Sequence, residues 1–254
     1  MMSSIERHQT EIHQNLRRWQ QKPLLRRIYR DFYREIASCL PDISGPIVEL
    51  GSGAADITEE IPDCLRTDLF FNPWIGLVEN AYRLPFAGSS LAGLILFDVF
   101  HHLRYPGTAL KEFHRVLTTG GRVILFEPAV SLLGRLLFGP LHPEPLALDQ
   151  PLTWSAPGEW SPGDVDYYAA QGNASRIFIG EERDLSSLGW SITALQQFSA
   201  LSYAASGGYS RPQVYPALLY PLLRWVEKGL DLFPSLFATR LLVGLEKISP
   251  GESH

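Results

Sequence analysis

A carboxylate and two glycines stand close together in the stretch VELGSGAAD, which runs from Val48 to Asp56. Gly51 and Gly53 can adopt backbone angles closed to other residues, and without a Cβ they let a ligand approach the main chain closely. Glu49 lies two residues before the first glycine, which suits a ligand with an ammonium group or another positive centre. The pattern therefore predicts a turn that binds an extended, partly cationic cofactor.

Two phosphate-binding patterns are absent from this turn. The dinucleotide pattern G-x-G-x-x-G needs glycine or alanine three residues after Gly53, where the chain has Asp56, whose charge would repel a pyrophosphate. The ATP-binding pattern G-x-x-x-x-G-K-[ST] is missing too, because GSGAADIT contains no lysine. S-adenosylmethionine, which carries an ammonium group and a sulfonium, fits the turn better than NAD or ATP.

A second group of reactive side chains follows the apolar run LAGLILF. Asp98, His101 and His102 stand within five residues of one another. Histidine is the usual base near neutral pH and contributes about 10²- to 10⁴-fold to a rate. His101 follows Asp98 by three residues, so we expect His101 to face the pocket as a catalytic base beside Asp98. In the alternative interpretation, Asp98 caps a short helix and the histidines bond to nearby backbone.

Short apolar runs alternate with helical or turn-rich stretches and must position these residues. PIVEL, CLRTDLF, LAGLILFDVF and RVILFEP are typical of strands, and TALKEFHRVL of a helix that ends at Gly120 or Gly121 in a left-handed cap. Such alternation indicates a parallel α/β sheet covered on both faces, with ligands beyond the carboxyl ends of its strands. An amphipathic helix precedes the sheet from Leu25 to Leu40, where Pro41 ends the pattern.

Four segments in order resemble the class I S-adenosylmethionine-dependent methyltransferases, in particular their type 11-like small-molecule branch. ELGSGAA is similar to E/D-x-G-x-G-x-G, with Ala55 in place of the third glycine, and RTDLF supplies an acid at the end of the second strand. NAYRLPFAGSSLAGLILFDVFHHL is similar to D-A-x-x-L-P-F, a turn, an apolar strand and H-H-L. RVLTTGGRVILFEP is similar to the helix, glycine turn and strand that follow. The resemblance covers roughly a third of the chain, from Ile47 to Pro128.

The resemblance implies a Rossmann-like sheet of seven strands. WSITALQQFSAL would be the sixth strand and TRLLVGLEKI the seventh, an antiparallel strand at the edge. The expected organisation is an N-terminal helical extension over residues 1–44 and a methyltransferase domain over residues 45–254. Two segments, about 129–184 and 202–235, are much longer than ordinary connections and would form a cap.

The resemblance also implies the cofactor S-adenosylmethionine, the product S-adenosylhomocysteine and a set of binding residues. These residues are Glu49, Gly51, Ser52, Gly53, Asp68, Leu69, Asn80, Ala81 and Asp98. The glycine turn and its acid would hold the methionine end, while Asp68 would bind both ribose hydroxyls and Leu69 would pack on the adenine. Asn80 would accept a hydrogen bond from the adenine amino group through its carbonyl oxygen, with the Ala81 amide beside the ring. Asp98 would face the methyl group and the substrate.

Aromatic and histidine residues in the cap, together with His102, are expected to contact the methyl acceptor. They are His102, His142, Trp154, Trp160, Tyr167, Tyr168, Tyr203 and Tyr209. The apolar stretches of the cap can be its packing core or can serve a lipid-linked acceptor, and the aromatic planes suit a sugar equally well. We expect methyl transfer to an oxygen, with carbon or nitrogen as the alternatives. A non-catalytic S-adenosylmethionine-binding partner or regulatory protein is the competing class, and an oxidoreductase comes third.

Composition limits the partners and the compartment. The chain has 254 residues, 45% of them hydrophobic, and a net charge of -5 that argues against a general nucleic-acid binder. Cys39 and Cys64 lack the spacing of a zinc site or a disulfide framework, so we expect no metal site and reduced thiols. Residues 3–21 lack the apolar core of a secretion signal, and no uncharged apolar run reaches about 20 residues. These features predict a cytoplasmic protein.

One basic segment suggests contact with a membrane surface. Seven basic residues stand between positions 17 and 34, against the single acid Asp31: Arg17, Arg18, Lys22, Arg26, Arg27, Arg30 and Arg34. Clustered basic residues attract an anionic lipid surface, so peripheral membrane contact is an expected partner interaction. The sequence leaves the oligomeric state open.

Overall fold

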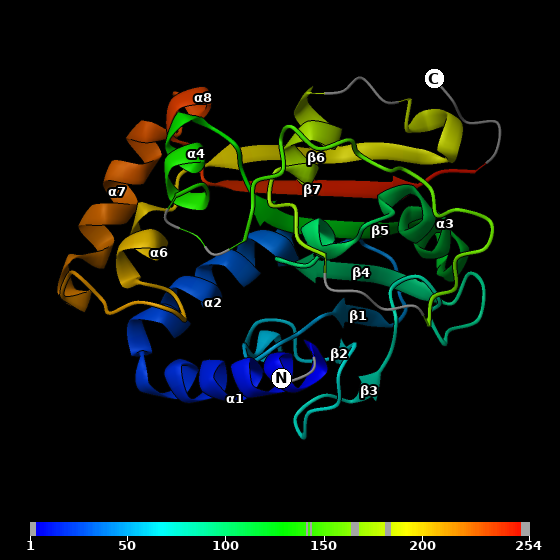
Figure 1. The fold of residues 1–254 in the computed structure, drawn as a ribbon, viewed down its shortest axis with the longest axis horizontal. Helices are drawn as coiled ribbons and strands as arrows, with labels where there is room; N and C mark the ends of the chain where they lie inside the picture. Colours follow the sequence, from blue (N-terminus) through cyan, green and yellow to red (C-terminus); the bar gives the residue numbers. More distant parts are fainter. Residues whose placement is uncertain (1–3, 141, 143, 164–167, 181–183, 250–254) are drawn as a thin grey trace.

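A seven-stranded sheet forms the centre of the protein (Figure 1). The computed structural model describes residues 4–140, 142, 144–163, 168–180 and 184–249, with side chains from residue 10 onward. The strand order is β3-β2-β1-β4-β5-β7-β6. The strands are β1 (Ile47–Leu50), β2 (Cys64–Asp68), β3 (Leu77–Val78), β4 (Leu91–Phe97), β5 (Leu117–Pro128), β6 (Trp190–Phe198) and β7 (Arg240–Lys247). The seven strands and the Rossmann-like α/β class are as the sequence predicted.

The direction of the last strand is confirmed, but its predicted place in the sheet is wrong. β7 pairs antiparallel with both β5 and β6, so it is an interior strand and β6 forms the edge. The burial patterns agree, because most of β7 is buried while β6 is largely exposed. A fully apolar run such as LLVGL is typical of a strand with neighbours on both sides, which explains its interior position.

Two hydrophobic clusters cover the two faces of the sheet. Because successive side chains of a strand point to opposite faces, Leu94 and Leu96 join one cluster while Ile95 and Phe97 join the other. Helix α3 (Pro106–Val116) packs in the first cluster and helix α2 (Pro23–Ser38) in the second. The helices predicted on either side of the strands therefore exist, and each buries one apolar face.

Residues 4–21 form a helix within the expected N-terminal helical extension, although the apolar pattern of the sequence located a helix only from Leu25 to Leu40. Helix α1 (Ser4–Gln21) is polar overall and buries Ile12 and Trp19, whereas α2 begins with a proline at its first turn and buries a continuous apolar stripe. The polar composition of α1 hid it, because only two of its described apolar side chains are covered. Helix α2 packs in the same hydrophobic cluster as side chains of the sheet. The domain boundary near residue 44 stays a prediction.

The predicted helix cap at Gly120 or Gly121 is wrong in part. Gly120 has the left-handed φ of +76°, but α3 ends at Val116, and both glycines belong to β5. The strand begins earlier than RVILFEP because Leu117 pairs with Leu91 before a shift in register at Gly93. The left-handed glycine therefore serves a bend of the strand.

The remaining helices lie mostly in the two long insertions. They are α4 (Leu132–Phe138), α5 (Asn173–Ser175), α6 (Leu201–Ser206), α7 (Tyr220–Leu230) and α8 (Pro234–Phe237), with a π-helical turn η3 (Arg176–Gly180) and the 3₁₀ turns η1 (Ile57–Glu59), η2 (Phe100–His102), η4 (Ser186–Leu188) and η5 (Ala217–Leu219). Figure 1 shows α4, α6, α7 and α8 gathered at one end of the sheet, beyond the carboxyl ends of β4 and β5. Within the described ranges, no helix is long and apolar enough to cross a membrane.

Candidate functional site

A cavity of about 360 Å³ opens at the carboxyl ends of β1, β2 and β4. The predicted residues in its lining are Gly51, Gly53, Asp68, Leu69, Asn80, Ala81, Asp98, His102, Trp160 and Tyr168. Side chains of α1, among them Ile12 and Asn15, line it as well, so the N-terminal extension covers part of the opening. The structure thus brings most of the predicted residues together in one place.

The glycine turn has the backbone conformation that its sequence predicts. Gly51 and Gly53 have φ values of +68° and +52°, in the left-handed region. A Cβ on Gly51 would lie 2.5 Å from Cγ2 of Val99, whereas a Cβ on Gly53 would meet nothing closer than 4.0 Å. At position 51, both the left-handed backbone and the contact with Val99 therefore favour glycine. At position 53, only the left-handed backbone does, because the space beside it is open.

Asp68 fixes the turn to the next strand. Its Oδ2 accepts a hydrogen bond from the Gly53 amide (3.1 Å) and its Oδ1 accepts one from the Phe70 amide (3.2 Å). The Ser52 amide donates to the Thr67 carbonyl at 2.9 Å. The carboxylate of Asp68 is thus held at the cavity wall by main-chain donors.

Two buried carboxylates, Glu49 and Glu79, lie close to this part of the wall. Glu49 is 1% exposed and does not line the cavity, and Glu79, which the sequence analysis missed, does line it. Burial raises the pKa of both groups to about 7. Among the described residues, the Oε2 atoms of both have no hydrogen-bond partner, so a cation at the glycine turn would stabilise the ionised form of Glu49. A partly cationic ligand is therefore compatible with this wall. Glu49 would act on it electrostatically from behind the glycine turn, because its side chain is not exposed to the cavity.

Asn80 ties the cap to the cofactor side of the cavity. Its Nδ2 donates to the carbonyl of Pro162 at 2.7 Å, and its Oδ1 accepts a hydrogen bond from the Tyr82 amide at 3.0 Å. Pro162 lies in the first insertion, so the side chain links that insertion to the segment after β3. The amide is engaged on both ends, and any contact with an adenine uses the second lone pair of Oδ1.

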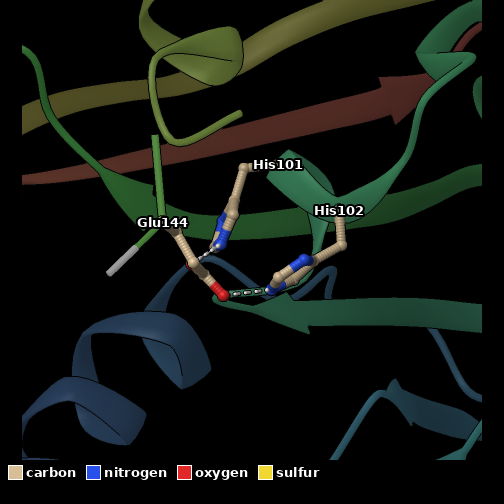
Figure 2. A group of neighbouring side chains, drawn as sticks. All are labelled: His101, His102 and Glu144. Atoms are coloured by element: carbon tan, nitrogen blue, oxygen red, sulfur yellow. Dashed lines mark ion pairs between the residues drawn. The ribbon is translucent and has the colours of Figure 1, made fainter. Parts of the chain in front are cut away.

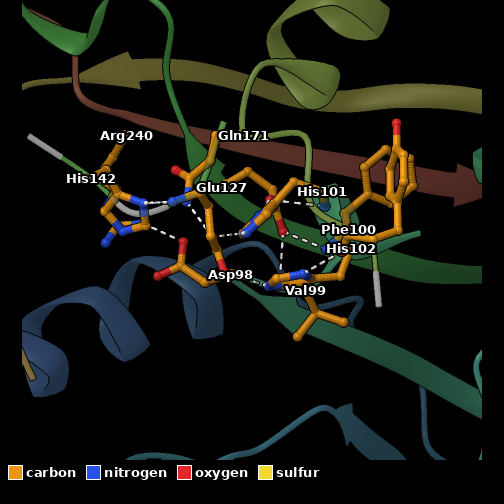
Figure 3. A network of polar contacts seen from close by, with 11 residues as sticks. Asp98, Val99, Phe100, His101, His102, Glu127, His142, Gln171 and Arg240 are labelled. Atoms are coloured by element: carbon orange, nitrogen blue, oxygen red, sulfur yellow. Dashed lines mark hydrogen bonds and ion pairs between the residues drawn. The ribbon is translucent and has the colours of Figure 1, made fainter. Parts of the chain in front are cut away.

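Glu127, at the end of β5, organises the turn that carries the two histidines (Figure 3). It is fully buried and accepts hydrogen bonds from the backbone amides of Val99 (2.9 Å), Phe100 (2.7 Å) and His101 (3.3 Å). His101 Nδ1 lies 2.6 Å from Oε2 of the same carboxylate. The single acid therefore holds the first turn of η2 at the carboxyl end of β4.

The two histidines have different surroundings, and the predicted orientation of His101 is wrong. His101 is 2% exposed and absent from the cavity lining, while His102 lines the cavity. Burial would lower the pKa of His101, but Glu127 outweighs it, and the pKa is raised to about 10. Burial and the neighbouring His101 charge lower the pKa of His102 to about 4. His101 is therefore poorly suited to be the general base, because it is paired with Glu127 and its raised pKa keeps it protonated. Its side chain faces β5 and not the cavity.

Asp98 lines the cavity in a left-handed backbone conformation, with φ of +55°. Its Oδ1 pairs with Nη1 of Arg240, which is 2% exposed at the start of β7. The Arg240 guanidinium also lies 4.6 Å from the centre of the Tyr203 ring. Asp98 therefore lines the cavity, while its carboxylate pairs with an arginine that the sequence did not indicate.

The predicted acceptor residues divide between the cavity and the packing of the cap. Tyr168 and Trp160 line the cavity, and the Tyr168 carbonyl lies 2.8 Å from His102 Nδ1. Trp154 instead packs against Gly107 at the start of α3, where the Trp154 carbonyl accepts the Gly107 amide. Its glycine contact explains why this tryptophan is not in the lining.

Three further acceptor predictions also fall outside the cavity lining. His142 Nδ1 lies 3.2 Å from Gln171 Nε2 and accepts the amide of Glu144. Tyr203 and Tyr209 pack on Tyr29 of α2, with ring centres 6.0 and 5.7 Å apart. The final predicted residue, Tyr167, lies outside the described residues.

Comparison with known proteins agrees with this geometry. Residues 51–125 match a family model described as a methyltransferase domain. A search of curated proteins gives no match. The complex of the Haloferax volcanii Trm112 methyltransferase activator with a methyltransferase contains a similar fold, with 13% identity over 87% of this chain and 90% of that chain and a TM-score of 0.51. An S-adenosylmethionine-dependent methyltransferase from Thermotoga maritima gives 13% identity, coverage of 94% and 100% and a TM-score of 0.50.

The two structures, at this identity, support the fold alone, and the family model supplies the assignment. Residues 51–125 therefore have the sequence of a methyltransferase domain, and they lie in a seven-stranded Rossmann-like sheet. The cofactor is S-adenosylmethionine, as the glycine turn and Asp68 indicated.

Replacing Gly51 tests the turn. Gly51→Ala should weaken S-adenosylhomocysteine binding more than tenfold, because the new methyl group meets Val99 and the left-handed φ costs about 1–3 kcal/mol. Gly120→Ala is the matched control, since Gly120 has φ of +76° and nothing within 4 Å of its Cβ. Calorimetry should show nearly unchanged affinity for Gly120→Ala. Equal losses of affinity in both variants would contradict a specific role of the Gly51 turn, because backbone strain alone would then explain the loss.

Replacing Glu127 tests the anchoring of the histidine turn. Glu127→Ala should lower the free energy of unfolding by about 3–5 kcal/mol, because it leaves buried donors without an acceptor. Glu246→Ala, which breaks the partly exposed pair with Arg122, should cost within about 1 kcal/mol. Urea unfolding measures both, and a Glu127→Ala loss no larger than that of Glu246→Ala would contradict the anchoring role.

Proposed function

We propose that the protein transfers the methyl group of S-adenosylmethionine to an oxygen of a small-molecule, lipid-linked or sugar acceptor. One observation carries the proposal: a single cavity has the glycine turn and Asp68 on one side and the polar groups of Asp98, His102 and Glu144 on the other. The first side suits the cofactor. The second offers carboxylates and an imidazole, groups that can orient a hydroxyl and receive its proton.

The residues on the cofactor side divide the ligand among them. The main chain at Gly51 and Gly53 would hold the methionine end, with the buried charge of Glu49 behind the turn. Asp68 would bind the ribose hydroxyls, and Leu69 would lie against the adenine. When bound, S-adenosylmethionine supplies a methyl group already activated by its sulfonium. The chain therefore has to bind, align and exclude water more than it has to activate.

A lipid-linked acceptor is supported by exposed apolar side chains at the same end of the sheet. Leu218, Trp225 and Leu232 are 87%, 73% and 77% exposed, and they belong to the second insertion around α7 and α8. α4, which packs on α8, adds Leu132 and Leu136. Insertions that only packed a cap core would bury these residues, whereas a contiguous exposed apolar surface commonly marks an interaction site.

The basic segment contributes less to membrane contact than its sequence suggests. Arg30 and Arg34 form ion pairs with Glu59 and Glu60, at 2.8 and 3.0 Å. Lys22 donates to the carbonyl of Gly208 at 2.7 Å, and Arg27 lies over the Tyr220 ring. Four of the seven basic residues therefore have partners within the chain. We propose that the main membrane contact is instead the apolar face, formed by the exposed side chains of Leu132, Leu136, Leu218, Trp225 and Leu232.

The acceptor class can be tested directly. Purified protein is incubated with methyl-labelled S-adenosylmethionine and a cell extract, and the label is then partitioned between organic and aqueous phases. Wild type should form S-adenosylhomocysteine and place label in the organic phase, while Asp68→Ala should form none, because it removes the carboxylate that holds the Gly53 amide and that is proposed to bind the ribose. Label confined to the aqueous phase would favour a sugar acceptor, and cofactor binding without turnover in any extract would favour a non-catalytic binding protein.

Vesicle flotation tests the membrane contact. Wild type should float with vesicles, and the double variant Trp225→Ser, Leu232→Ser should float several-fold less because it loses exposed apolar area. Phe71→Ser is the control, since Phe71 is also 70% exposed but lies after β2. Equal recovery on neutral and anionic vesicles would reject a contribution from the basic residues, and equal recovery of all three proteins would reject the apolar face.

A further inference from the structure

We infer that His101, His102 and Glu144 form a binding site for one divalent transition-metal ion, of the class of Zn²⁺ or Fe²⁺, on the acceptor side of the cavity. Figure 2 shows the two imidazoles and the carboxylate turned toward one another. The three groups each offer one ligand atom, and these atoms lie within 4.8 Å of one another. Two histidines and one carboxylate are a donor set found in zinc and non-haem iron sites.

The distances between the groups suit a shared ion better than direct hydrogen bonds. His101 Nε2 lies 3.6 Å from Oε2 of Glu144, and His102 Nε2 lies 3.7 Å from Oε1. A charge-assisted hydrogen bond would be about 2.7–2.9 Å long. An ion about 2.0–2.1 Å from each ligand atom holds neighbouring ligand atoms about 3.3 Å apart in tetrahedral geometry, so ligand atoms that lie within 4.8 Å of one another would have to move together by up to about 1.5 Å.

The orientation of each imidazole points its second nitrogen at the common centre. His101 Nδ1 faces Glu127 at 2.6 Å, and His102 Nδ1 faces the Tyr168 carbonyl at 2.8 Å. Both acceptors have only lone pairs, so each Nδ1 carries the proton and donates it. In the neutral imidazole, the lone pair then lies on Nε2, directed toward the carboxylate of Glu144; at His101, whose pKa Glu127 raises, the ion would have to displace the proton on Nε2. A cation between these groups would be within reach of a ligand atom from each of the three.

The partners behind the ligands are those expected of a metal site. Histidine ligands of metals nearly always donate their other ring N–H to a carboxylate or a backbone carbonyl, as His101 and His102 do here. The carboxylate of Glu144 is oriented as well, because Gln171 Nε2 donates to its Oε2 at 2.6 Å. Figure 3 shows Glu127 and Gln171 close to the histidines. Each of the three ligands thus has a buried or half-buried group that fixes its direction.

The position of the site gives the ion a role toward the acceptor. His102 and Glu144 line the cavity that also contains Asp98 and the glycine turn. An ion held there would coordinate an oxygen of the acceptor, orient it and favour loss of its proton. That role rests on the proposed function, whereas binding of the ion does not.

Metal titration of the complete chain tests the site. Protein purified without a histidine tag and treated with a chelator is titrated with Zn²⁺ by calorimetry and with Co²⁺ by visible absorption. Wild type should bind one equivalent, and His102→Gln and Glu144→Gln should each bind more than about 100-fold more weakly, since a ligand is worth more than the 10- to 100-fold of its supporting partners. Gln171→Leu, which leaves all three ligands in place, should lose about 10-fold.

Two controls separate binding at this site from binding to surface histidines and from loss of the fold. His13→Gln removes an exposed histidine of α1 and should leave the affinity unchanged. S-adenosylhomocysteine binding, measured on every variant, shows that the fold and the cofactor side are intact. Metal binding without methyl transfer would support the site and count against the proposed function. The inference is overturned if wild type binds no metal, which is the result expected if His101 only forms hydrogen bonds with Glu127 and Glu144. It is also overturned if wild type and Glu144→Gln bind the metal equally well.

Discussion

The arrangement of the site depends on one buried carboxylate, Glu127. β5 is an interior strand, and a charged side chain at its end must be compensated because desolvation of an ion is expensive. The compensation comes from the amides at the start of η2 and from His101. The same contacts fix the direction in which the chain leaves β4, and hence the positions of Asp98 and His102 at the cavity. The residues that compensate the buried charge of Glu127 are thus the same residues that shape the site.

The cap is joined to this centre by polar contacts between segments distant in sequence. The Pro162 carbonyl accepts from Asn80, the Tyr168 carbonyl accepts from His102, and the Ala170 amide donates to the carbonyl of His101. These contacts bring Trp160, Pro162 and Tyr168 back over the carboxyl ends of β1, β2 and β4, although the insertion begins after β5. This part of the cavity wall is therefore built from a segment that Asn80 holds at one point and the turn of His101 and His102 holds at two others.

The sheet and the glycine turn were predictable because their patterns are local. Apolar runs set strands, and Gly51 and Gly53 follow β1 directly, so neighbouring residues decide their conformation. Long-range partners were not predictable: nothing near Asp98 in the sequence indicates Arg240, and nothing near His102 indicates Glu144. The apolar pattern did not locate helix α1 for a related reason, since its few buried side chains are covered by tertiary contacts. The one available signal for Glu127 was an acid inside the apolar run VILFEP, which is unusual in a buried strand.

Asp98 shows how such long-range contacts maintain a strained backbone at a functional position. A left-handed aspartate costs about 1–3 kcal/mol and persists only where its surroundings over-determine it. Here the Asp98 amide donates to the Phe126 carbonyl at 2.9 Å, and its carboxylate pairs with Arg240 across the sheet. Arg240 is in turn enclosed by aromatic rings, including those of Phe126 and Tyr203. The chain turns sharply after β4 as a result, which directs Asp98 and His102 into one cavity while His101 faces β5.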